Sequence, residues 1–199
     1  MTASAIKYVS LEEYFEFEYN AKIRHEYLDG KIRPMSYTSP NHGKIVHNLS
    51  RIFGNYFFDA DGQIWTETRM VYTPGRNKVF YPDAVIVLGE PEYFNYKGKM
   101  LATLNPTVLV ETASVSTEEN DKTEKWECYQ SIPSLQQYML VSQQSPFVSL
   151  YERQASDSEK WIYTGHSNLT DIIKIGGCDV AIKDIYHKVE FPKQDVETA

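Results

Sequence analysis

Two carboxylates in this chain have the residue type and the setting that metal-assisted hydrolysis needs. Asp83 precedes the apolar run Ala84 to Leu88, and Glu111 ends the apolar, β-branched run Thr107 to Val110. If buried strands bring both acids to one pocket, they repel each other unless a cation or a proton lies between them. Carboxylate oxygens suit Mg²⁺ or Mn²⁺, and the sequence has no Cys and His cluster at zinc spacing. We therefore expect Asp83 and Glu111 to bind Mg²⁺ or Mn²⁺.

A lysine downstream of Glu111 is the third candidate. Lys125 follows Asp121 by four residues and precedes Tyr129 by four, so all three share one face if this segment is helical. We expect the Lys125 amine to turn toward the two acids.

The segment from Thr107 to Ser142 must position these groups. An apolar run ending at Glu111 is followed by a Ser/Thr-rich turn, a charged helical segment ending near Ile132, and a second apolar run from Tyr138 to Val141. This order predicts strand, helix and parallel strand, and parallel strands are normally covered on both faces. Glu111 then lies at the carboxyl end of a buried strand, where ligands bind in open α/β sheets.

The rest of the chain has the local signals of further helices and strands. Expected elements are a short helix from Ser10 through about Glu18, a hairpin over His25 to Ile32 turning at Asp29-Gly30, a long helix from Ser39-Pro40, an extended segment from Ile64 to Tyr72, a polar and aromatic loop from Gly89 to Asn105, antiparallel strands at Phe147 to Tyr151 and Trp161 to Tyr163, and one or two short strands between Asn168 and Ile185.

Composition predicts one soluble α/β domain over residues 1–199, with a core at about residues 8–192. The chain has 199 residues, no repeat and no apolar run long enough to cross a bilayer. Its two cysteines, Cys128 and Cys178, lie far apart and favour a reduced, cytoplasmic setting. The formal net charge of -7 argues against nonspecific affinity for nucleic acid but leaves room for a local basic groove.

In their order along the chain, these motifs resemble the PD-(D/E)XK nuclease superfamily, and within it a bacterial family labelled "putative restriction endonuclease" and formerly a domain of unknown function. The resemblance covers roughly Tyr8 to Ser142. The matching elements are HEYLDGKI, SPNHGKIVHNL, Pro82-Asp83, Glu111, and SVST followed by NDKTEKWECYQ.

The resemblance implies a restriction-endonuclease-like α/β fold, in which helices flank a mixed central sheet and additional antiparallel strands lie at the C-terminal end. It implies an endonuclease that uses Mg²⁺ or Mn²⁺ to hydrolyse nucleic acid, with DNA as the expected substrate. The family analogy also implies a homodimer, paired through the carboxyl-terminal strands.

The site residues implied by this resemblance depart from the superfamily pattern at one position. The usual lysine two residues after Glu111 is Ala113 here, and Lys125 is expected to project into the space that the small residue leaves. Asp83 and Glu111, with the Thr112 carbonyl, would then hold the metal, and Lys125 would orient a water molecule or stabilise developing charge. Glu26 would complete the catalytic set by binding a second metal or its water shell. In supporting roles, Asp121 and Tyr129 would hold the lysine, and His42 would cap or line the start of the long helix.

Simpler alternatives remain for three of these residues, whereas Glu111, a charge after four apolar strand residues, needs a partner. Asp83 could only begin a strand beside a proline, Lys125 could be a solvated helix lysine paired with Asp121, and Glu26 could be an ordinary charge on a hairpin edge. Tyr93, Phe94 and Tyr96 could stack on bases or fold back on the domain. The whole chain could be a noncatalytic module that binds nucleic acid or protein through a degenerate nuclease fold.

Overall fold

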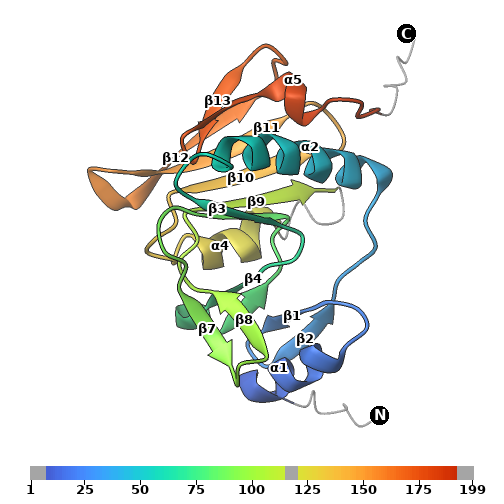
Figure 1. The fold of residues 1–199 in the computed structure, drawn as a ribbon, viewed down its shortest axis with the longest axis vertical. Helices are drawn as coiled ribbons and strands as arrows, with labels where there is room; N and C mark the ends of the chain where they lie inside the picture. The colour runs from blue at the N-terminus through green and yellow to red at the C-terminus, as the bar shows by residue number, and fades with distance from the viewer. Residues whose placement is uncertain (1–7, 115–120, 192–199) are drawn as a thin grey trace.

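The structure, a computed structural model, describes residues 8–114 and 121–191, with side chains from residue 123 onward in the second range. Figure 1 shows the arrangement of the elements. The helical elements are α1 (Leu11–Asn20), α2 (Pro40–Phe57), η1 (Pro74–Arg76), η2 (Asp121–Lys125), α4 (Trp126–Tyr129) and α5 (Ile182–Ile185). The strands are β1 (His25–Leu28), β2 (Lys31–Pro34), β3 (Gln63–Thr66), β4 (Met70–Thr73), β5 (Lys78–Phe80), β6 (Ala84–Val87), β7 (Tyr93–Tyr96), β8 (Met100–Thr103), β9 (Val108–Ala113), β10 (Gln137–Ser142), β11 (Val148–Gln154), β12 (Asp157–His166), β13 (Ile172–Ile175) and β14 (Cys178–Ala181).

Most strands belong to two mixed sheets of six strands each. The amino-terminal sheet has the order β2-β1-β5-β4-β8-β7, and the central sheet has the order β12-β11-β10-β9-β6-β3. A separate antiparallel pair, β13 and β14, follows near the carboxyl end. The expected mixed α/β class with extra antiparallel carboxyl-terminal strands is confirmed, while the division of the strands into two large sheets was not evident from the sequence.

The expected parallel pair lies inside the central sheet. β9 and β10 pair in parallel, with Val108 opposite Gln137 and Glu111 opposite Leu140. All of β9 is buried, as the apolar run at Thr107 to Val110 predicts. The connection between the two strands includes a short π-helix, η2, which continues into the single turn of α4.

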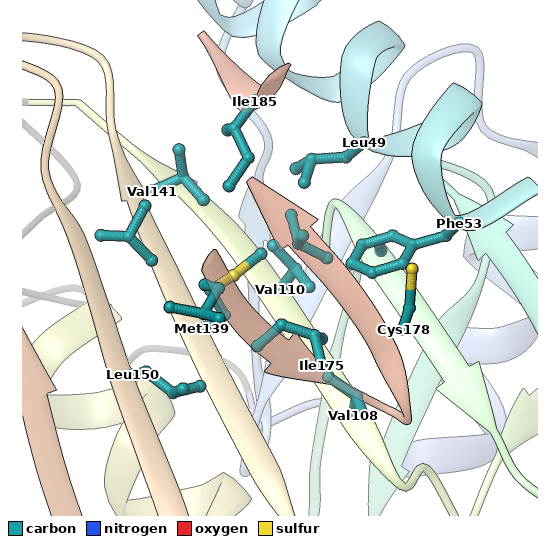
Figure 2. Packing of buried hydrophobic residues seen from close by; sticks show 14 of the residues in the cluster. Leu49, Phe53, Val108, Val110, Met139, Val141, Leu150, Ile175, Cys178 and Ile185 are labelled. Carbon is teal, nitrogen blue, oxygen red and sulfur yellow. The ribbon is translucent and has the colours of Figure 1, made fainter. Parts of the chain in front are cut away.

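Helices cover both faces of the central sheet. Ser39 caps α2 by accepting a hydrogen bond from the His42 amide, and Pro40 occupies the first turn, as expected for a helix start. The buried side of α2, with Leu49 and Phe53, packs on residues such as Val110, as Figure 2 shows. Because side chains alternate along β9, Leu109 points the other way, into a second cluster that includes Tyr129 of α4. In Figure 1, α4 lies between the central and amino-terminal sheets, whereas α2 covers the opposite face of the central sheet.

The first hairpin has the expected turn. Asp29 and Gly30 both have positive φ, at 44° and 91°, as a two-residue turn between antiparallel strands requires. The hairpin lies at the edge of the amino-terminal sheet, as expected, with β2 as the edge strand and β1 between β2 and β5. Glu26 of β1 is nevertheless buried, with an exposed fraction of only 6%, so it is not an ordinary solvated charge of a hairpin edge.

Two segments differ from the sequence-based expectation. The aromatic loop expected at Gly89 to Asn105 contains the antiparallel strands β7 and β8, which pair from Tyr93 opposite Thr103 to Tyr96 opposite Met100. The single extended segment expected from Ile64 to Tyr72 is divided between β3 of the central sheet and β4 of the amino-terminal sheet. Glu67 lies between them with a φ of 53°, so the chain turns there as it passes from one sheet to the other.

Among the residues that the structure describes, no helix combines the length and the apolar character needed to cross a bilayer.

Candidate active site between two sheets

Beside β9, the buried side chains of Lys125 and Tyr129 both contact the carboxylate of Glu111. The Glu111 Oε1 atom accepts hydrogen bonds from Lys125 Nζ at 3.0 Å and from the Tyr129 hydroxyl at 2.9 Å. Glu111 is 4% exposed and Lys125 9%. Burial, followed by the negative charge of Glu111, raises the pKa of Tyr129 well above its ordinary value, so the hydroxyl stays protonated and can donate.

The Lys125 amine also lies close to an acid of the amino-terminal sheet. Its Nζ atom is 3.5 Å from Glu26 Oε1, while Glu26 Oε2 accepts two hydrogen bonds from Arg33, from Nε at 3.0 Å and from Nη2 at 2.7 Å. Lys125 therefore connects Glu111 of the central sheet with Glu26 of the amino-terminal sheet.

The residue before this lysine is held from the same sheet. Glu124 accepts hydrogen bonds from Lys78 of β5 at 2.9 Å and from Arg33 of β2 at 3.3 Å. Because both donors lie on the amino-terminal sheet, they tie η2, and with it the backbone of Lys125, to that sheet.

Asp83 has a different set of partners. Its Oδ1 atom is 2.9 Å from His42 Nε2, and its Oδ2 atom accepts the Thr112 backbone N–H at 2.6 Å. The Thr112 amide belongs to the residue immediately after Glu111, so Asp83 lies beside the same stretch of β9. The Thr112 carbonyl accepts a hydrogen bond from Gln143 Nε2 at 3.0 Å.

His42 also faces a second carboxylate. Its Nδ1 atom is 3.9 Å from Glu67 Oε1, and single ligand atoms of His42, Glu67 and Asp83 all lie within 4.8 Å of one another. Burial lowers the pKa of His42, but the hydrogen bond and charge of Asp83, together with the charge of Glu67, outweigh burial and raise it. The positive charge of Lys125 acts in the opposite direction and lowers the His42 pKa.

The expected residues thus gather around β9, with several changes in their partners. Tyr129, which was expected to hold Lys125, donates to Glu111, the acid that Lys125 contacts, and the side chain of Asp121 lies outside the described residues. Both candidate acids have protein donors. The argument that their charges require a cation is therefore weaker than the sequence suggested, although a carboxylate has about four acceptor sites and can accept a further ligand.

Sequence reasoning missed Glu67 and Arg33. Glu67 follows an ordinary extended segment, and Arg33 is one charge among several on a hairpin, so no local pattern distinguishes them. His42 was expected near the start of the long helix, but its pairing with Asp83 joins residues 41 positions apart.

The aromatic residues considered for base stacking fold back on the protein. Phe94 and Tyr96 both stack on Phe15 of α1, with ring centroids 5.2 and 5.4 Å apart. The Arg69 guanidinium lies 4.4 Å from the centre of the Tyr93 ring. This packing explains why the segment forms strands, and it favours the structural role for all three side chains.

The fold matches that of a solved protein of Anabaena variabilis ATCC 29413, described as "a putative nuclease belonging to DUF820". The two structures align with a TM-score of 0.68 over 89% of this chain and 97% of the other, at 13% sequence identity. At that identity the likeness concerns the fold alone.

Sequence comparison identifies the family. Residues 11–174 match the Uma2 family, described as "Putative restriction endonuclease", and the chain belongs to that family. Two Synechocystis sp. proteins are similar along most of their length. "Uncharacterized protein slr1290" is 31% identical over 92% of this chain and 94% of its own, and "Uncharacterized protein sll1609" is 28% identical over 82% of this chain and 90% of its own. The family resemblance expected from the motifs is confirmed.

Proposed function

We propose that the protein is a metal-dependent endonuclease that hydrolyses phosphodiester bonds of nucleic acid, with DNA as the expected substrate. Membership of a family described as "Putative restriction endonuclease" supports this function. The observation that carries it is the contact of 3.0 Å between Lys125 and Glu111, because it supplies beside the acid the amine that the sequence lacks at Ala113.

Asp83 and Glu111, with the Thr112 carbonyl, form the proposed ligand set for Mg²⁺ or Mn²⁺. Their oxygen atoms suit these hard cations, and the side chain of Asp83 is 13% exposed, so that a ligand can reach it. When bound, such a cation polarises the phosphate and lowers the pKa of a coordinated water.

Side chains of the protein are proposed to orient the attacking water and to stabilise the charge that develops on the phosphate. Lys125 orients the attacking water or stabilises the negative charge that develops on the phosphate. Glu111 and Glu26 hold the ammonium between two sheets, and Tyr129 supports it through Glu111. Glu26 is also proposed to hold the water shell of a second metal, although its Oε2 atom is already engaged by Arg33.

The test is Mg²⁺-dependent cleavage of duplex, single-stranded and structured nucleic acids. Asp83→Ala and Glu111→Ala should abolish cleavage, and the isosteric Asp83→Asn and Glu111→Gln should do the same with less risk to the fold. Glu90→Ala is a matched control, because Glu90 is an exposed acid outside the site. Undiminished cleavage in a folded Asp83 or Glu111 variant would rule out the assignment.

A noncatalytic module that binds nucleic acid or protein is the second candidate. The pairing of both acids with protein donors and the net charge of -7 favour it. Calorimetric titration of the folded protein with Mg²⁺ and Mn²⁺ tests this candidate, because a protein that binds neither cation lacks what the proposed nuclease needs, whereas binding has to be followed by the cleavage assay. The proposed homodimer, in either case, is tested by the molecular mass in solution.

A further inference from the structure

One ring nitrogen of His42 is buried without a hydrogen bond. The side chain is 9% exposed, and Nδ1 has no hydrogen-bond partner among the described residues. The nearest acidic oxygen, Glu67 Oε1, is 3.9 Å away, which is too long for a hydrogen bond. A buried polar atom without a partner needs a physical explanation, and the capacity to bind a cation is one.

The orientation of the ring is set by Asp83. The 2.9 Å contact between His42 Nε2 and Asp83 Oδ1 favours a proton on Nε2, which leaves a lone pair on Nδ1, the atom 3.9 Å from Glu67 Oε1. Metal-binding histidines usually donate their other ring N–H to a carboxylate or carbonyl in this way. Asp83 therefore fixes the tautomer and the ring orientation of His42 that a metal-binding imidazole needs.

Hydrogen bonds hold the backbone of Glu67, whose carboxylate oxygen lies 3.9 Å from this nitrogen. Its amide donates to the Asp83 carbonyl at 2.9 Å, and its own carbonyl accepts a hydrogen bond from Arg24. These bonds hold a φ of 53°, which is uncommon for a residue with a side chain. The Glu67 side chain is 46% exposed, so its carboxylate is open to solvent, whereas His42 Nδ1 is buried.

We infer that His42 Nδ1 and the Glu67 carboxylate bind a divalent transition cation, with Asp83 orienting the imidazole. The 3.9 Å between Nδ1 and Oε1 is less than twice a metal–ligand bond of about 2.1 Å, so one cation can bind both atoms. The nitrogen ligand selects Mn²⁺, Co²⁺ or Zn²⁺ over Mg²⁺. This inference deepens the proposed function, because Asp83 belongs to both sites, but cation binding can be measured without any cleavage.

Electron paramagnetic resonance of bound Mn²⁺ tests the inference directly. The wild-type protein should show the nitrogen hyperfine coupling of a bound imidazole, and His42→Gln should remove it. His47→Gln is the matched control, because His47 lies on the exposed side of the same helix and should retain the coupling. Circular dichroism of each variant verifies that α2 and the sheets are folded.

Binding affinity gives a second measurement. Glu67→Gln should raise the Kd for Mn²⁺ at least about tenfold, while the exposed Glu90→Gln should leave it unchanged. Mg²⁺ at the same concentration should not displace the bound Mn²⁺.

Three results would overturn the inference: no binding of Mn²⁺, binding without imidazole coupling, or coupling that persists in His42→Gln. The last two leave the proposed nuclease intact, since a site made of carboxylates alone can still support cleavage. Conversely, imidazole-bound Mn²⁺ in a protein that cleaves no nucleic acid would support this site and contradict the proposed function.

Discussion

Removing the Lys125 ammonium should destabilise the protein strongly, because it leaves a buried carboxylate short of a cationic partner. In Lys125→Met the chain keeps its apolar stem, while Glu111 loses a contact of 3.0 Å at a position only 4% exposed. Breaking one partner of a buried ion pair typically costs 3–5 kcal/mol, and the remaining Tyr129 hydrogen bond places the expected loss at about 3 kcal/mol. For a chain of this length, that loss corresponds to a fall in Tm of about 6–12 °C.

The assay is urea unfolding followed by circular dichroism, with free energies from linear extrapolation. Lys174→Met is the control, because Lys174 Nζ lies at the same 3.0 Å from Asp179 but the two side chains are 69% and 68% exposed. That variant should leave the unfolding midpoint unchanged, since exposed pairs are solvated and screened.

A double variant checks the cause. Glu111→Gln with Lys125→Met removes both charges, so its loss of stability should be smaller than the sum of the two single losses by more than about 1 kcal/mol. A loss below about 1 kcal/mol for Lys125→Met, or simple additivity in the double variant, would refute the claim that this pair is buried and coupled.

Two further predictions concern α2, which carries both His42 and Phe53. The His42 pKa, followed by NMR, should lie above its ordinary value near 6.5 and fall in Asp83→Asn. Because the folded-state pKa of His42 is raised, the stabilisation from the His42–Asp83 pair is fully present below the unfolded-state pKa. It is lost as the pH rises through the folded-state pKa. A His42 pKa at or below 6.5 would contradict the pairing. Phe53→Ala should cost about 3–5 kcal/mol in urea unfolding, because Phe53 is fully buried between α2 and the sheet, whereas Phe58→Ala, at an 86% exposed position, should change little; equal losses would show that the α2 packing is wrong.

Local patterns predicted much of this fold. The apolar run ending at Glu111, the Asp29-Gly30 turn and the Ser39-Pro40 helix start all form the elements expected of them. In each case the determining forces act between residues that are near in sequence, through backbone sterics, capping or the alternation of apolar side chains. The segment Gly89 to Asn105 was misjudged because its strands depend on packing against Phe15, more than seventy positions earlier.

The candidate site likewise has features that the sequence predicts and features that only the structure shows. The sequence alone identified Asp83, Glu111 and Lys125 by their residue types, their order and their place beside buried strands. It could not show that Arg33 and Glu124, 91 positions apart, would hold the backbone of that lysine, or that Glu67 would face His42. Those contacts exist only because two sheets and two covering helices bring distant strand ends together. Local sequence determined which ionisable and polar groups were available for chemistry. The sheet topology decided which of them form ion pairs and hydrogen bonds with one another, because both interactions depend on separation in space.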